Sequence, residues 1–156
     1  MTREGDLVGI SIEDCEGMLR EMVAAGGMAF AFEGKDAVCE LLPREAAGLE
    51  VAEGWAMMKG PGGRFRLDMK AVEKVELAEE EGVGAPVSYS ARFFDASGRC
   101  LLRASFPNPY LDDDGRPTGF VARRLALFED FCRRYSGADG VEVRRLHRAH
   151  LGPERP

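Results

Sequence analysis

Arginines at alternate positions of the expected β-strands are the residues of this chain whose chemistry is easiest to name. Arg64 and Arg66 share one face of a strand, and Arg92 shares a polar face of another strand with Ser88 and Ser90. A guanidinium group pairs with a carboxylate in bidentate fashion, so these arginines could hold the carboxylates of a flat ligand. The wet face of an antiparallel sheet shows the same pattern and is the commoner case. Both interpretations stand at this point.

Two methionines precede the first of these arginines. Met57 and Met58 lie on an expected strand next to the glycine-rich turn Gly60–Gly63. Methionine side chains could line an adaptable pocket for a planar apolar ligand, although they more often fill gaps in a core.

Other common catalytic and metal-binding sets are missing from the sequence. The only histidines, His147 and His150, lie in an Arg-rich tail, so no base for a nucleophilic triad is expected in the core. The four cysteines are far apart, with no CxxC pair, which disfavours zinc; they are Cys15, Cys39, Cys100 and Cys132. Reduced, buried thiols are the expectation.

Length and composition indicate one globular domain over residues 1–156. The chain is 45% hydrophobic and 31% charged, and its net charge of −6 argues against a nucleic-acid-binding protein. No apolar run approaches the roughly 20 residues that span a bilayer. The polar start leads directly into a capped helix, so no signal peptide is expected. We therefore expect a soluble, cytoplasmic protein.

Two helices are predicted, one near each end. The first runs from a Ser11 cap to about Ala25, and Thr118 is the expected cap of the second. The second helix carries an apolar stripe at helical spacing, made of Val121, Leu125, Phe128, Cys132 and Tyr135, and widened by Phe120, Leu127 and Phe131. Residues 137–156 are expected to form a frayed tail.

Short strands joined by turns fill the middle of the chain. They are expected at residues 28–33, 37–42, 54–58, 64–69, 72–77, 86–94 and 99–106. A turn at Gly34–Asp36 is expected to join the first two, and residues 43–49 are expected to form a loop or a short helical turn. Glu79–Gly82 is expected to be the solvated end of its strand, and Asp95–Gly98 a hairpin turn with a left-handed glycine. Because no βαβ rhythm occurs, the predicted fold class is α+β, with a curved, mostly antiparallel sheet of six or more strands and both helices packed against it.

Three segments resemble a known family. They are Gly63-Arg64-Phe65-Arg66-Leu67-Asp68, residues 72–77, and Ser90-Ala91-Arg92-Phe93-Phe94-Asp95-Ala96-Ser97-Gly98. This pattern resembles the repeat of the HemS/ChuX-type haem-utilisation proteins, over about residues 55–135. The resemblance implies an antiparallel sheet platform, haem as ligand, and a two-fold homodimer, because the chain holds one copy of the repeat.

The chain also departs from that family. Its body lacks the histidine that ligates haem in the tandem-repeat members, and it lacks a tryptophan near the start of the closing helix, where Phe120 or Phe128 stands instead. Haem iron also accepts tyrosine, and Tyr110, in a proline-flanked loop, is the candidate metal ligand. Arg64, Arg66 and Arg92 would meet the propionates, and Met57 and Met58 the ring.

The resulting functional hypothesis is storage or delivery of haem without bond chemistry, with no membrane or nucleic-acid partner. Whether the chain is an enzyme is left open, with the non-enzymatic role favoured. The alternatives are an enzyme that degrades haem or a related tetrapyrrole, and a structural dimeric domain that has lost haem binding.

Overall fold

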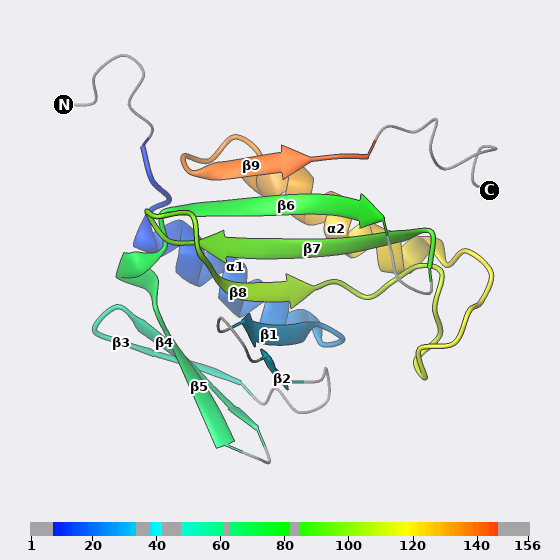
Figure 1. The fold of residues 1–156 in the computed structure, drawn as a ribbon, viewed down its shortest axis with the longest axis horizontal. Helices are drawn as coiled ribbons and strands as arrows, with labels where there is room; N and C mark the ends of the chain where they lie inside the picture. The colour runs from blue at the N-terminus through cyan, green and yellow to red at the C-terminus, as the bar shows by residue number, and fades with distance from the viewer. Residues whose placement is uncertain (1–7, 34–37, 42–47, 61–62, 82–84, 147–156) are drawn as a thin grey trace.

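A computed structural model describes residues 8–33, 38–41, 48–60, 63–81 and 85–146. Within them the chain forms a six-stranded sheet with two helices on one face, and a smaller three-stranded sheet beside it (Figure 1). The expected turn at Gly34–Asp36 and both histidines lie outside the described residues. No helix in the described part of the chain has the length and apolar character needed to cross a membrane.

The first helix, α1 (Ile12–Ala25), begins and ends where the sequence predicts. The Ser11 side chain accepts a hydrogen bond from the Asp14 amide at 3.0 Å, which satisfies one of the free N–H groups of the first turn. The helix stops before Gly26. One face of the helix is buried in the core, through Cys15, Met18, Leu19 and Met22.

The six-stranded sheet has the order β2-β1-β8-β7-β6-β9. Its strands are β1 (Ala29–Glu33), β2 (Val38–Leu41), β6 (Lys74–Glu81), β7 (Val87–Phe94), β8 (Cys100–Ser105) and β9 (Val141–Arg144). All pairs are antiparallel except β6 with β9. The β7–β8 hairpin is confirmed, and Gly98 adopts a φ of 88° in its turn, a conformation that favours glycine. The α+β class with a mostly antiparallel sheet is therefore confirmed.

The second helix, α2 (Ala122–Tyr135), covers the same face of the six-stranded sheet as α1. Its Phe128 ring lies 5.0 Å from the Tyr89 ring of β7 and 5.3 Å from Phe106, measured between centroids, so the two layers join through aromatic packing. The expected cap is wrong: the helix begins after Val121 with no side-chain cap. The Thr118 amide instead donates to the Tyr110 carbonyl at 2.9 Å, which keeps Thr118 in the preceding loop.

The acidic run after residue 78 and part of the expected frayed tail are both strand. β6 continues to Glu81, and Glu79, expected in solvent, is only 1% exposed, because the alternation of the strand turns it toward α2. β9 lies within the expected tail and pairs with β6 in parallel. Arg145, one residue beyond β9, forms an ion pair with the Glu79 carboxylate at 2.6 Å. This contact gives the buried acid a cationic partner and links the end of β9 to the sheet.

The three-stranded sheet consists of β3 (Leu49–Ala52), β4 (Trp55–Gly60) and β5 (Gly63–Asp68), followed by a 3-10 turn, η1 (Met69–Ala71). Its inner face enters the common core through Ala56, Met58 and Leu67. β3 was not predicted as a strand. Apart from β9, the other strands lie close to their predicted positions.

Candidate ligand-binding site

The outer face of the three-stranded sheet gathers several of the predicted site residues. Cross-strand pairing places Met57 opposite Arg66 and Lys59 opposite Arg64. Paired residues of an antiparallel sheet point to the same side, and every second residue of a strand does so too. One surface therefore carries Glu50 and Ala52 from β3, Trp55, Met57 and Lys59 from β4, and Arg64, Arg66 and Asp68 from β5. We call this surface the Trp55 face.

The arginines of the Trp55 face are open to solvent. Arg64 and Arg66 are exposed, and neither forms an ion pair with another described residue. The Arg66 guanidinium lies 5.3 Å from the centroid of the Trp55 ring, a cation–π contact. Lys59 forms an exposed ion pair with Glu50 at 3.3 Å. The face thus offers guanidinium groups that keep their capacity for an external carboxylate.

The two predicted methionines do not act together. Met57 is half-buried on the Trp55 face, whereas Met58 is fully buried in the core on the opposite side of β4. Neighbouring residues of a strand point to opposite faces, so a pocket on one side of the sheet reaches only one of them. Met57 remains in the candidate site, and Met58 serves as core packing.

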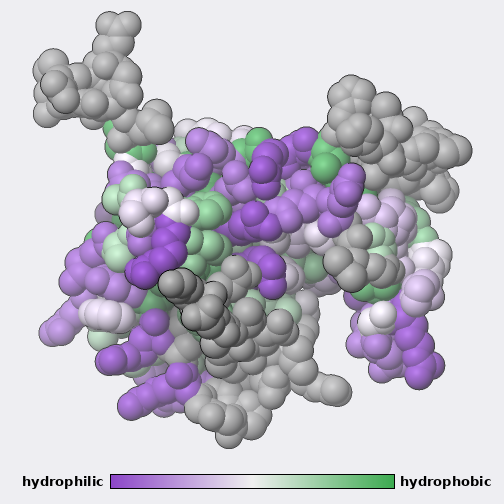
Figure 2. Space-filling model, viewed as in Figure 1, coloured by the Kyte–Doolittle hydropathy of each residue, from purple (hydrophilic) through white to green (hydrophobic). Residues whose placement is uncertain are grey.

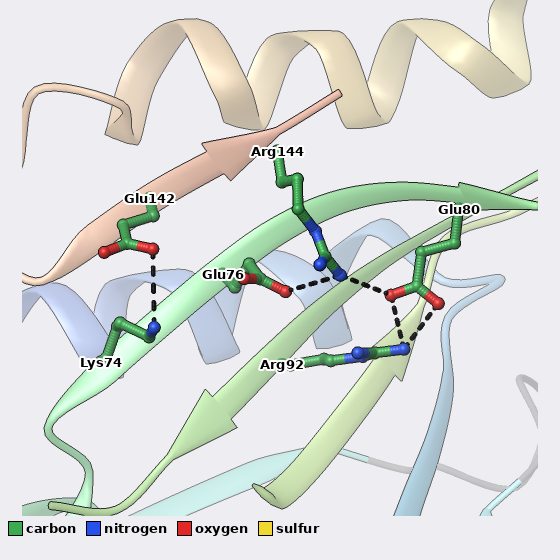
Figure 3. A network of polar contacts seen from close by, with 6 residues as sticks. All are labelled: Lys74, Glu76, Glu80, Arg92, Glu142 and Arg144. Carbon is green, nitrogen blue, oxygen red and sulfur yellow. Dashed lines mark hydrogen bonds and ion pairs between the residues drawn. The ribbon is translucent and has the colours of Figure 1, made fainter. Parts of the chain in front are cut away.

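Arg92 belongs to a different surface, the face of the six-stranded sheet that α1 and α2 leave uncovered. Hydrophilic side chains follow β6, β7 and β9 on this face (Figure 2). There Arg92 contacts the Glu80 carboxylate at 2.5 Å, and the partners are only 26% and 28% exposed (Figure 3). Arg144 bridges Glu76 at 3.1 Å and Glu80 at 3.2 Å. A ligand carboxylate would have to replace an internal one to reach Arg92.

Tyr110 lies beyond the end of β8. Its ring is half-buried and packs on Phe120, with centroids 5.4 Å apart. In Figure 1 the segment after β8 extends to the side of the molecule opposite the three-stranded sheet. The structure therefore does not bring Tyr110 together with Arg64 and Arg66.

A pocket of about 280 Å³ occurs elsewhere, at the β7–β8 turn. Its walls include Val8, Lys74 and Phe94, and none of the six predicted site residues lines it. Its volume is at the lower limit for small-molecule sites.

The two buried thiols, those of Cys15 and Cys132, are poorly suited to bind a metal ion. Burial raises the pKa of Cys15 to about 12 and that of Cys132 to about 11, so both remain protonated at neutral pH and are poor metal ligands. Among the described residues no three histidine, cysteine or acidic side chains converge on a point. On the Trp55 face the one soft donor is the Met57 thioether, a type of ligand that haem iron accepts. Cations, an aromatic ring and this donor together fit a flat ring that carries carboxylates.

Sequence reasoning missed Trp55, which it used only as a sign of a strand. The available signal was its position two residues before Met57, which places both side chains on one face. Its nearness to Arg66 depends on strand pairing and is seen only in the structure.

Comparisons with known proteins give a fold and no close relative. No protein-family model matches the chain, and no curated protein matches it by sequence. Among solved structures, one titled as the heme binding protein ChuX superposes with a TM-score of 0.62 at 12% identity, covering 81% of this chain and 76% of that one. A protein from Agrobacterium tumefaciens gives 0.61 at 18% identity, covering 85% and 73%.

A longer protein shares the same fold in part. PhuS, a heme-binding protein from Pseudomonas aeruginosa, gives a TM-score of 0.55 at 13% identity, and the match covers 78% of this chain and 33% of that one. At such identities the likeness is one of fold. The resemblance drawn from the sequence is confirmed at that level: the chain has the ChuX/HemS-type fold of haem-utilisation proteins.

Proposed function

We propose that this protein binds haem and stores or delivers it without bond chemistry. The observation that carries the proposal is the fold shared with ChuX, titled a heme binding protein, over 81% of this chain. The exposed arginines of the Trp55 face support it, because a haem propionate needs a cation that no internal carboxylate neutralises. Bound haem would supply an iron centre, and the protein's part is to shield the ring and pair its charges.

Of the predicted set, Arg64, Arg66 and Met57 form the contiguous part of the proposed site. Met58 is not part of the proposed site, because its side chain is buried in the core. Arg92, on the six-stranded sheet, remains a proposal for a propionate, and Tyr110, in the loop after β8, remains a proposal for the iron. A cytoplasmic location and a homodimer complete the proposal.

The test is a titration of the purified protein with hemin, followed through the Soret band. Saturable binding with one hemin per chain and a shifted Soret band is the expected result. A Soret band lost on addition of reductant and oxygen would identify a haem-degrading enzyme instead. No spectral change at any hemin concentration would leave a structural domain and refute the proposal.

Two single variants test the proposed roles of Tyr110 and Arg92. Tyr110→Phe removes the only oxygen that this side chain can offer to iron, so an unchanged Soret position would rule out its role as axial ligand. Arg92→Gln leaves Glu80 without one of its two described cations. If hemin affinity is unchanged in Arg92→Gln, the propionate is bound elsewhere.

A further inference from the structure

We propose that Trp55 stacks on the ring of the bound ligand and that Lys59, Arg64 and Arg66 bind its carboxylates. This inference rests on the proposed function, since it names where and how a flat, carboxylate-bearing tetrapyrrole lies. It assigns the ligand to the Trp55 face and not to the six-stranded sheet.

The exposure of Trp55 is the first observation. The residue is 37% exposed, and it is the sole aromatic residue among the large hydrophobic residues that the described part of the chain leaves exposed. An indole ring on a wet sheet face leaves apolar surface in water that a flat ligand would cover. Met57, two residues along the same strand, extends this surface.

The contact between Arg66 and Trp55 is the second observation. The guanidinium lies 5.3 Å from the ring centroid, where the ring quadrupole attracts it. Such a contact at an exposed site is worth only about 0.5–1 kcal/mol, so a large aromatic ring can displace the guanidinium. Arg66, once displaced, remains beside the ring and can turn to a carboxylate of the same ligand.

The pairing of Lys59 with Arg64 is the third observation. The two residues are directly opposite each other on β4 and β5, and like charges in this position destabilise a sheet. Glu50 forms an ion pair with Lys59 at 3.3 Å, but no described carboxylate pairs with Arg64. The Trp55 face carries three cations, Lys59, Arg64 and Arg66, and two carboxylates, those of Glu50 and Asp68. Its net charge is thus positive, whereas that of the whole chain is −6. An external carboxylate between Lys59 and Arg64 would remove the repulsion.

The spacing suits a ligand whose ring and carboxylates lie at different ends. Trp55 and Lys59 are four residues apart on one strand, or about 14 Å. A ring over Trp55 and Met57 therefore places the carboxylates of one edge near Lys59 and Arg64. The alternative cation, Arg92, already holds Glu80 at 2.5 Å in a half-buried pair.

The experiment uses Trp55 as a reporter, because it is the only tryptophan in the chain. The indole N–H gives one cross-peak in a nitrogen–proton NMR spectrum. The full chain is titrated with gallium(III) protoporphyrin IX, a diamagnetic ring with both propionates. If the porphyrin stacks on Trp55, its ring current shifts this cross-peak strongly upfield, while amides of α1 stay in place. Hemin affinity is measured in parallel by the Soret band.

Three variants complete the design. We expect Trp55→Leu to weaken hemin binding about tenfold, from the loss of aromatic stacking. The double variant Arg64→Gln/Arg66→Gln should weaken it between about 10-fold and 100-fold, from the loss of charge-assisted hydrogen bonds. Arg20→Gln, which changes an exposed arginine of α1, is the matched control and should bind as wild type does. Circular dichroism checks that each variant folds.

The outcomes separate the two proposals. An upfield indole shift together with both affinity losses supports the assignment. Hemin binding with an unmoved indole cross-peak overturns it and leaves the proposed function intact, as does wild-type affinity in Trp55→Leu and the double variant. If wild type binds neither hemin nor the gallium porphyrin, the proposed function fails and this assignment with it. If Trp55→Leu does not fold, the wild-type indole shift decides alone.

Discussion

Replacing Arg145 by methionine should destabilise the protein, because it breaks an ion pair with a buried carboxylate. The Arg145 guanidinium lies 2.6 Å from a Glu79 carboxylate oxygen and 2.5 Å from one of Glu129. The Glu79 side chain is fully buried, and its carboxylate also accepts a hydrogen bond from the Leu146 amide at 3.3 Å. Methionine keeps most of the apolar stem but removes the guanidinium charge, so a buried carboxylate loses the cation at 2.6 Å.

The size of the effect follows from burial. Breaking a buried ion pair by removing one partner costs about 3–5 kcal/mol, because the remaining charge stays desolvated. The Arg145 side chain is itself 33% exposed, so water can reach the space that it leaves, and we expect a loss at the lower end of this range. The Glu129 contact is exposed and adds less than about 1 kcal/mol. We expect the free energy of unfolding to fall by about 3 kcal/mol, a large part of the 5–15 kcal/mol usual for a domain.

Urea unfolding followed by far-UV circular dichroism measures this loss, and a double-mutant cycle isolates its cause. In Glu79→Met/Arg145→Met neither charge of this pair remains, so the free energy of unfolding should recover most of the loss. Glu129→Gln is the control, with a loss below about 1 kcal/mol. A loss below about 1 kcal/mol in Arg145→Met, or a double variant as unstable as the sum of the singles, would refute the argument.

Four further predictions concern the core, a buried thiol, a glycine and the assembly. Phe128→Ala should lower the free energy of unfolding by about 3–5 kcal/mol in urea titrations, since its ring is fully buried; a loss below about 1 kcal/mol would contradict the packing. Burial raises the pKa of Cys15 to about 12, above its value in the unfolded chain. The contribution of this thiol to the free energy of unfolding is therefore present at neutral pH and is lost as the pH rises from about 9 to 12, by up to about 1.4 kcal/mol per pH unit. The free energy of unfolding should fall less steeply with pH in Cys15→Ala than in wild type, and identical slopes would exclude this cause. A Cβ at Gly140 would lie 2.2 Å from the Ile10 backbone nitrogen, so Gly140→Ala should lower the melting temperature far more than Gly137→Ala, where nothing lies within 4 Å; equal losses would refute the close approach. Light scattering at micromolar concentration should give twice the 17.1 kDa chain mass, and a monomer that persists on concentration would remove the proposed dimer.

The features that the sequence predicts correctly are the ones set by near neighbours in the chain. The Ser11 cap contacts an amide three residues away, and the Asp95 side chain accepts hydrogen bonds from the Ser97 and Arg99 amides inside the hairpin turn. Hydrogen bonds to Asp95, that of the Ser97 side chain first, lower the pKa of its carboxyl. Such interactions close small loops at little entropic cost, so the local residue types suffice to indicate them.

The site was predictable only in part. Alternation along β5 correctly placed Arg64 and Arg66 on one face. It could not show that Arg92 is paired with Glu80, nor that Arg66 lies over Trp55, because these contacts depend on which strands become neighbours. The separation of Met57 from Met58 does follow from alternation, and the sequence already contained that information.

The sequence by itself determined the helices, most of the strands and the fold resemblance, because these depend on periodicity and on turn residues. Only the tertiary structure decided which charged side chains are buried and which residues they pair with. Glu79 stands in an acidic run that is typical of solvent, and Arg145 in a tail rich in arginine, yet they meet at 2.6 Å across 66 residues of chain. A charge is buried only where a distant partner compensates its lost hydration, and no local pattern reveals that partner.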